Sequence, residues 1–221
     1  NAAGDRVAIG ATGNDGNGSG SGHARIYDWD GSSWIQLGQD IDGEAVGDYS
    51  GSVSMNAAGD RGAIGADGND GNGTYAGHAR IYDWDGSSWV QLGQDIDGEA
   101  SYDRSGYVSM NATGDKVAIG AIRNAGNGLD AGHVRIYEFS NGSWNQLGQD
   151  IDGEAGGDDS GASVLMSDDG SIVAIGAYQN DGNGSAAGHV RVYEFSNGSW
   201  IQLGQDIDGE AAGDNSGYSV S

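Results

Sequence analysis

Three carboxylates within five residues recur along the chain, and they are the side chains with the clearest capacity for chemistry. They belong to the segment QLGQDIDGEA, which begins at Gln36 and returns unchanged at Gln91, Gln146 and Gln202. In an extended chain, the Asp-Ile-Asp alternation places both aspartates on one side and the isoleucine on the other. Carboxylate oxygens are preferred ligands of calcium. The pattern predicts Ca²⁺ as a candidate cofactor, held by metal ligands drawn from Asp40, Asp42, Asp95, Asp97, Asp150, Asp152, Asp206 and Asp208.

A structural role for the same acids is the alternative. Carboxylates accept hydrogen bonds from backbone N–H groups in turns, and the isoleucine between them suits a packed connector. A second acidic loop, GNDGNG from Gly13, also offers oxygen ligands, but its aspartate, Asp15 in the first copy, becomes Ala125 in the third. An obligatory ligand would not tolerate that replacement. Its two asparagines persist in every copy, as at Asn14 and Asn17, and are expected to hold left-handed turn conformations.

One histidine per repeat raises a second question of chemistry. The four are His23, His78, His133 and His189, and an arginine follows each two positions later, at Arg25, Arg80, Arg135 and Arg191. Residues two apart in a strand share a face. We therefore expect each His-Arg pair to bond structurally to acids of a neighbouring repeat. A shared ligand groove lined by these pairs is the alternative.

The repetition itself argues against catalysis. An active site needs an asymmetric set of groups in one place, whereas nearly every polar feature of this chain occurs four times. No nucleophile–base pair, phosphate loop or unique acid–base dyad stands out. The absence of cysteine removes thiolate chemistry as well. The sequence therefore predicts that the protein is not an enzyme.

Charge and hydropathy exclude two classes of partner. The chain carries 33 acidic and 9 basic residues, a net charge of −24. Nucleic acid is excluded because phosphate binding requires lysine and arginine. No apolar run approaches the roughly 20 residues that span a bilayer, so membrane insertion is not expected.

Four repeats must position these groups. VAIGA at Val7 returns at residues 62, 117 and 173, with intervals of 55, 55 and 56 residues. Each repeat holds four strand-like runs, which in the second copy begin at Gly51, Arg61, His78 and Trp89. Gly- and Asn-rich turns close the runs, as two-residue hairpins require. No segment has a helical period.

Four antiparallel strands in a repeat of this length are typical of a β-propeller blade. We therefore expect an all-β fold, a β-propeller with four repeats of about 55 residues, each giving a four-stranded antiparallel blade. The whole chain, residues 1–221, is predicted to be a single domain with repeat boundaries near 49, 104, 159 and 215. Closure is expected through pairing of the strand at Gly217 with the strand at Arg6, so that one blade is shared between the termini.

The segment GDYSGSVSMNAAGDRGAIGA, from Gly47 to Ala66, resembles the FG-GAP repeat of integrin α-subunit propellers and their bacterial and algal-type extracellular relatives. The resemblance covers all four repeats. It departs from the family pattern where serine replaces the phenylalanine, as at Ser50. The turn NAAGD is also too short for the family's calcium loop, so the calcium sites of the family cannot be carried over to that turn.

These features together favour a non-catalytic extracellular or cell-surface module for adhesion or structure. Calcium would stabilise it, and its partners would be other copies of itself, cell-surface proteins or glycans. The alternative is a multivalent glycan-binding propeller with pockets between the blades.

Overall fold

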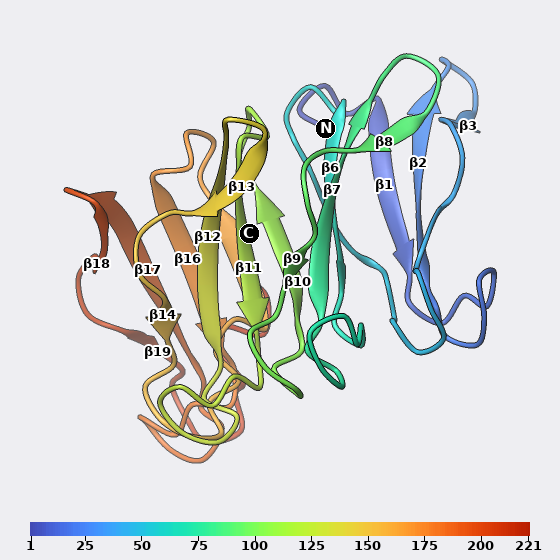
Figure 1. Ribbon diagram of the computed structural model, residues 1–221. Coiled ribbons are helices and arrows are strands. Elements are labelled where there is room, and N and C mark those ends of the chain that lie inside the picture. Colours follow the sequence, from blue (N-terminus) through green and yellow to red (C-terminus); the bar gives the residue numbers. More distant parts are fainter.

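The computed structural model describes residues 1–221 and confirms the all-β fold. Four antiparallel sheets lie side by side in chain order, from β1–β3 at one side of Figure 1 to β15–β19 at the other. No helix is long and apolar enough to cross a membrane. The expected strands are present, and each sheet gains one short strand that the sequence did not predict.

The first sheet lacks the strand that opens every other sheet. Its order is β1-β2-β3, with β4 pairing β2. The second sheet runs β5-β6-β7-β8, with β9 pairing β7. Their bounds are β1 Arg6–Ala11, β2 His23–Trp29, β3 Trp34–Gln36, β4 Ile41–Asp42, β5 Ser52–Met55, β6 Arg61–Ala66, β7 His78–Trp84, β8 Trp89–Gln91 and β9 Ile96–Asp97.

The third and fourth sheets repeat the arrangement of the second. They run β10-β11-β12-β13 and β15-β16-β17-β18, with β14 pairing β12 and β19 pairing β17. Their bounds are β10 Ser105–Met110, β11 Lys116–Ala121, β12 His133–Ser140, β13 Ser143–Gln146, β14 Ile151–Asp152, β15 Ser163–Met166, β16 Ile172–Ala177, β17 His189–Ser196, β18 Ser199–Gln202 and β19 Ile207–Asp208. The short fifth strand is the Ile-Asp pair of QLGQDIDGEA, so part of the predicted connector belongs to the sheet.

Hairpin turns follow the expected chemistry. Asn141 and Gly142 join β12 to β13 with φ angles of 54° and 83°. Two successive positive φ angles match the right-handed twist of the flanking strands. The first hairpin has Gly31, with a φ of 97°, at the corresponding place. The turns therefore fix the register that brings each tryptophan opposite an aromatic residue of the preceding strand, as in the Trp144–Phe139 pair.

The hydrophobic core lies between sheets, because each of its three clusters draws residues from two adjacent sheets. One joins Ile26 and Ile41 of the first sheet to Ile64 and Trp89 of the second. Two further clusters join the second sheet to the third and the third to the fourth. A single sheet is too thin to bury its own side chains, so each repeat depends on its neighbours for stability.

Glycine in the VAIGA strands allows two repeats to approach closely. A Cβ atom at Gly65 of β6 would lie 1.7 Å from the carbonyl oxygen of Gly106 in β10. A Cβ atom at Gly10 would lie 1.8 Å from the carbonyl oxygen of Gly51. A side chain at either position would push neighbouring repeats apart, which explains why the penultimate residue of each of these strands is glycine.

The pairing that would close a ring is not present in this structure. β1 pairs with β2 alone. The C-terminal segment instead lies against the fourth sheet, where the Val220 N–H donates to Ser163 Oγ at 2.9 Å. Closure and the predicted domain limits therefore stay predictions.

Candidate functional site

Each histidine begins the strand that follows the VAIGA strand of its sheet (β2, β7, β12 or β17) and lies beside two carboxylates. The histidine pairs in register with the last alanine of the preceding strand and with the aspartate of the short strand, as in the His78–Ala66 and His78–Asp97 pairs. This places every histidine at the same end of its sheet. The four His–carboxylate clusters are His23–Asp40–Asp42, Glu44–His78–Asp95, Glu99–His133–Asp150 and Glu154–His189–Asp206.

Three of the clusters join adjacent repeats. In the second cluster, Glu44 comes from the segment after β4, whereas His78 and Asp95 belong to the next repeat. The His78 Nδ1 atom lies 4.0 Å from Glu44 Oε2 and 4.0 Å from Asp95 Oδ2. Of the expected His-Arg contacts to a neighbouring repeat, the structure has arginine ion pairs to a glutamate of the preceding repeat at Arg80, Arg135 and Arg191, whereas Arg25 pairs within its own repeat. These acids and histidines could hold a metal ion, which was the coarser part of the prediction.

In the first and third clusters, the arginine two residues after the histidine binds an aspartate of its own repeat. Arg25 donates from Nε and Nη2 to Asp40 at 2.9 and 2.6 Å. Arg135 donates to Asp150 at 2.9 and 2.8 Å, and its Nη2 also contacts Glu99. These hydrogen bonds hold the pKa of both aspartates below the usual range.

In the second cluster the arginine reaches back to the preceding repeat instead. Arg80 Nη2 donates to the backbone carbonyl oxygen of Asp42 at 2.9 Å, and its Nη1 lies 3.2 Å from Glu44 Oε1. Asp95 receives a hydrogen bond from Gln91 and none from arginine. The fourth cluster has the same arrangement. The arginine that follows each histidine therefore makes two kinds of contact, with an aspartate of its own repeat in the first and third clusters and with the backbone of the preceding repeat in the second and fourth.

Burial favours the neutral imidazole at His78 and His133. Burial and the nearby Arg80 guanidinium lower the pKa of His78 to about 4, although Asp95 opposes the shift. Burial, followed by the charge of Arg135, also lowers the pKa of His133. A neutral imidazole keeps one nitrogen lone pair free for a proton or a metal ion.

The asparagines of the GNDGNG loops position the glutamates, a role that the sequence did not indicate. The side-chain amide of Asn72 donates to the carbonyl oxygens of Gly98 and Glu99 at 2.8 and 3.1 Å. Neither Asn14 nor Asn17 has a positive φ angle. The expected left-handed conformation was therefore wrong for these two residues. They hold the loop through side-chain hydrogen bonds, in which Asn14 accepts from the Gly16 N–H and Asn17 donates to the Gly43 carbonyl oxygen.

The predicted metal ligands separate into two groups. The clusters bring together Asp40, Asp42, Asp95, Asp150 and Asp206, whereas Asp97, Asp152 and Asp208 lie outside them. In the other three clusters, the second carboxylate comes from the glutamate of QLGQDIDGEA, which is Glu44, Glu99 or Glu154. It comes from the preceding repeat, so reading one repeat at a time could not identify it. Asp48, which follows the same segment, is buried and accepts hydrogen bonds from the backbone N–H groups of Glu44 and Ala45 at 3.0 and 2.9 Å.

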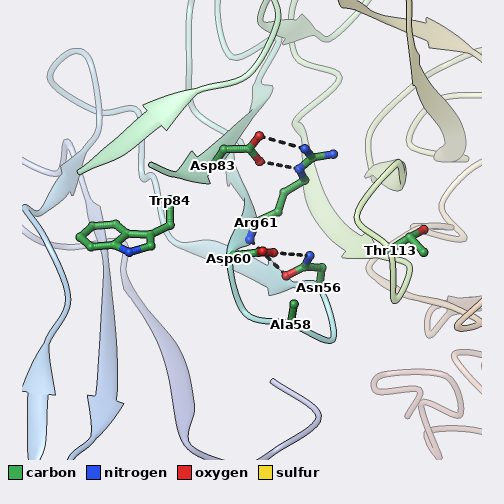
Figure 2. A pocket seen from close by; sticks show the side chains of 7 residues that line it. All are labelled: Asn56, Ala58, Asp60, Arg61, Asp83, Trp84 and Thr113. Carbon is green, nitrogen blue, oxygen red and sulfur yellow. Dashed lines mark hydrogen bonds and ion pairs between the residues drawn. The ribbon is translucent and has the colours of Figure 1, made fainter. Parts of the chain in front are cut away.

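A groove of about 370 Å³ lies at the opposite end of the second sheet. Figure 2 shows Arg61 paired with Asp83, Asn56 bonded to Asp60, and Thr113 of the next repeat on the far side. Arg61 Nη2 donates to Asp83 Oδ2 at 2.9 Å, and Asn56 Nδ2 donates to Asp60 Oδ1 at 2.8 Å. The Arg61 Nη1 group also donates to the carbonyl oxygen of the turn residue Gly114.

This groove is not repeated four times. The first repeat has an equivalent of about 320 Å³ lined by Asp5, Arg6 and Asp28. In the third repeat, lysine at 116 replaces the arginine and Glu138 replaces the aspartate. In the fourth, Ile172 removes the cation. The assumption that all polar features repeat was therefore wrong at this end of the sheets.

No family model and no curated protein matches the sequence. Solved structures do match the fold. A candidate 6-phosphogluconolactonase from Bacteroides uniformis has a TM-score of 0.58 and 11% identity, over 86% of this chain and 49% of that one. The periplasmic gluconolactonase of Pseudomonas aeruginosa has a TM-score of 0.58 and 14% identity, over 95% and 52%. The β-propeller domain of the Trilobed protease from Pyrococcus furiosus has a TM-score of 0.53 and 9% identity, over 92% and 55%.

These likenesses show the propeller fold, and the chain spans about half the length of the structures it resembles. They give no specific evidence for the FG-GAP resemblance. They also contradict the expectation of a non-catalytic adhesive or glycan-binding module and the exclusion of an enzyme, because lactonase-type proteins have this architecture. The exclusion failed because repetition of the scaffold does not prevent one or two repeats from carrying their own polar groove.

Proposed function

We propose that this protein is a hydrolase of small sugar-acid lactones, acting in the groove at the start of β6. The observation that carries the proposal is the groove itself, where Asp60, Arg61 and Asp83 meet. Only one other repeat, the first, has an equivalent set of residues. The architecture shared with the Pseudomonas gluconolactonase supports the choice of substrate class.

The groove suits a small polar substrate. Its volume of about 370 Å³ falls at the lower end of the roughly 300–1,000 Å³ typical of ligand pockets. Asn56 and Thr113 offer hydrogen-bonding groups for hydroxyls, and Arg61 offers a cation for the negative charge that develops on the lactone carbonyl oxygen. Asp83 holds the guanidinium through two parallel contacts, so that it is oriented before the substrate enters.

Asp60 is the base in this proposal. Only one hydrogen bond, from Asn56, engages its carboxylate, and its side chain is exposed to solvent. Asp60 takes a proton from water while the water oxygen bonds to the lactone carbonyl carbon. Arg61 stabilises the oxyanion that forms. The ring C–O bond then breaks, and the leaving oxygen takes the proton from Asp60, which returns to the carboxylate.

The proposal is tested by measuring the hydrolysis of glucono-δ-lactone and of its 6-phosphate through the uptake of base in a pH-stat. Because two repeats carry the groove, Asp60→Asn alone should remove part of the activity. The double variant Asp5→Asn/Asp60→Asn should reduce it about a hundredfold, as expected on loss of a general base. Asp115→Asn, which changes the equivalent aspartate of the third repeat, is the matched control and should keep full activity. No acceleration over buffer, or full activity in the double variant, would refute the proposal.

The expectations about a metal ion and about the location of the protein are changed as follows. We infer that a divalent cation bound at a His–carboxylate cluster is of the zinc class, since an imidazole nitrogen is a poor calcium ligand. The periplasmic location of the Pseudomonas protein supports a location of this protein outside the cytoplasm. The FG-GAP relationship and the predicted partners, other copies or cell-surface proteins and glycans, stay predictions.

A further inference from the structure

We propose that Glu154, His189 and Asp206 form a binding site for a divalent transition-metal ion such as Zn²⁺. This fourth His–carboxylate cluster lies between the third and fourth sheets. The inference does not rest on the proposed hydrolysis, because the groove lies at the opposite end of the sheets.

The first observation is an imidazole without partners. The side chain of His189 is only 1% exposed. Neither its Nδ1 nor its Nε2 atom has a hydrogen-bond partner. A buried polar group left unpaired costs roughly 1–3 kcal/mol. A ligand at Nδ1 would remove that cost, and Nδ1 is the atom directed at the two carboxylates.

The second observation is the spacing of the three ligand atoms. His189 Nδ1 lies 3.8 Å from Glu154 Oε2 and 4.0 Å from Asp206 Oδ2. Both separations are too long for hydrogen bonds. Zinc binds nitrogen and carboxylate oxygen at about 2.0–2.2 Å. Two such ligands at a tetrahedral angle are about 3.4 Å apart, so the three side chains need to close by only a few tenths of an ångström around an ion.

The third observation is the position of the competing cation. Arg191 Nη2 donates to the backbone carbonyl oxygen of Asp152 at 2.7 Å, and Nη1 stays 3.8 Å from Glu154. Asp206 receives a hydrogen bond from Gln202 and from no arginine. The two carboxylates here share one guanidinium, which lies 3.8 Å from Glu154 and does not bridge them. This charge imbalance favours a bound cation.

The third cluster shows what a filled arrangement looks like. Arg135 Nη2 contacts both Glu99 and Asp150 there, so its guanidinium lies where an ion would bridge the two acids. A metal ion at that cluster would have to displace it. The second cluster is intermediate, since Arg80 stays 3.2 Å from Glu44. We therefore expect the fourth cluster to bind first and the first and third not to bind.

The ligand set selects the class of ion. One imidazole nitrogen and two carboxylate oxygens suit Zn²⁺, Co²⁺ or Fe²⁺. Calcium and magnesium prefer oxygen ligands alone. The rim carboxylates of Glu154 and Asp206 are 43% and 27% exposed, which leaves further coordination positions open to water.

Titration of chelator-treated full-length protein with Zn²⁺ by isothermal calorimetry tests the proposal. Glu154→Gln and Asp206→Asn should each weaken the tightest binding step by at least about tenfold. Both positions are partly exposed, so the variants should keep the fold, and far-UV circular dichroism checks this. In a parallel titration with Co²⁺, the visible absorption bands should be lost with the same variants.

Two matched variants complete the test. Asp208→Asn removes a neighbouring acid outside the cluster, and Glu99→Gln removes the equivalent acid of the third cluster. Both should bind Zn²⁺ in the tightest step as the unmodified protein does. Retained tight binding in Glu154→Gln and Asp206→Asn would overturn the assignment. So would a loss of tight binding in Glu99→Gln, or no binding to the unmodified protein.

Discussion

The first and second sheets contain the same twelve residues in very different surroundings. HARIYDWDGSSW occupies residues 23–34 and again 78–89. Trp34 is 47% exposed and Trp89 only 3%. The arginine side chain of the first copy, Arg25, is 39% exposed, and that of the second, Arg80, is 7%. The difference lies in the neighbouring sheet, because the first sheet packs against the second sheet only.

This contrast shows that a repeat acquires its core and its polar site from the repeat before it. Trp89 donates from Nε1 to the Leu37 carbonyl oxygen of the first sheet at 2.9 Å. Glu44, also from the first repeat, completes the second His–carboxylate cluster. Neither contact exists for the first copy. Stability and site formation are both properties of the interface between repeats.

Replacement of the hairpin tryptophan should give the largest difference between the two sheets. Trp89→Ala removes a buried indole and its hydrogen bond, so it should lower the free energy of unfolding by about 3–5 kcal/mol. Trp34→Ala removes a half-exposed ring with no such bond and should cost less than about 1 kcal/mol. Urea unfolding followed by circular dichroism measures both. Equal costs would show that the face of the first sheet is covered in solution.

The isoleucine of the VAIGA strand gives the next effect. Ile64 is 3% exposed in the core between the first two sheets, whereas Ile9 is 51% exposed. Ile64→Ala should cost about 2–5 kcal/mol. Ile9→Ala should stay within about 1 kcal/mol of the unmodified protein. The same urea titration distinguishes them. A large cost at Ile9 would point to a partner surface on β1, including the predicted closing strand.

The sequence was sufficient for the repeat, the strands and the placement of His and Arg on one face of the same strand. Periodicity and turn residues act locally, so these features need no knowledge of the neighbours. The unequal burial of Trp34 and Trp89 could not be read from identical residues. The glutamate of each cluster was also missed, because Glu44 meets His78 across a sheet interface. The groove at Arg61 was missed because it depends on a residue that differs among the repeats, with lysine at 116 and isoleucine at 172.

Acid should destabilise the second sheet through its histidine. The pKa of His78 is lowered from 6.5 to about 4 by burial. Between these values the unfolded chain binds a proton and the folded protein does not, so stability is full above pH 6.5 and falls as the pH decreases toward 4. The loss amounts to about 3 kcal/mol.

The matched variant isolates this effect from the other titrating groups. His78→Gln removes the proton-binding site, so its unfolding free energy should vary less between pH 7 and pH 4 than that of the unmodified protein. The difference between the two pH profiles is the quantity to measure. Parallel profiles would mean that His78 does not change its protonation on unfolding. His23→Gln provides the comparison for a histidine whose cluster lies wholly within the first sheet.

The smallest effect should come from ion pairs that the two sheets share. Arg6 donates to Asp28 at 2.8 Å and Arg61 to Asp83 at 2.9 Å, with similarly exposed side chains. Partly exposed ion pairs contribute about 0–1 kcal/mol. Arg6→Gln and Arg61→Gln should therefore cost nearly the same, below about 1 kcal/mol each, in urea unfolding. Because each pair lies within one sheet, equal costs would place the whole difference between the two copies at the face between sheets. A clearly larger cost at Arg61 would instead mean that its contact with Gly114 ties the second repeat to the third more strongly than the Arg6 contact with Gly59 ties the first to the second.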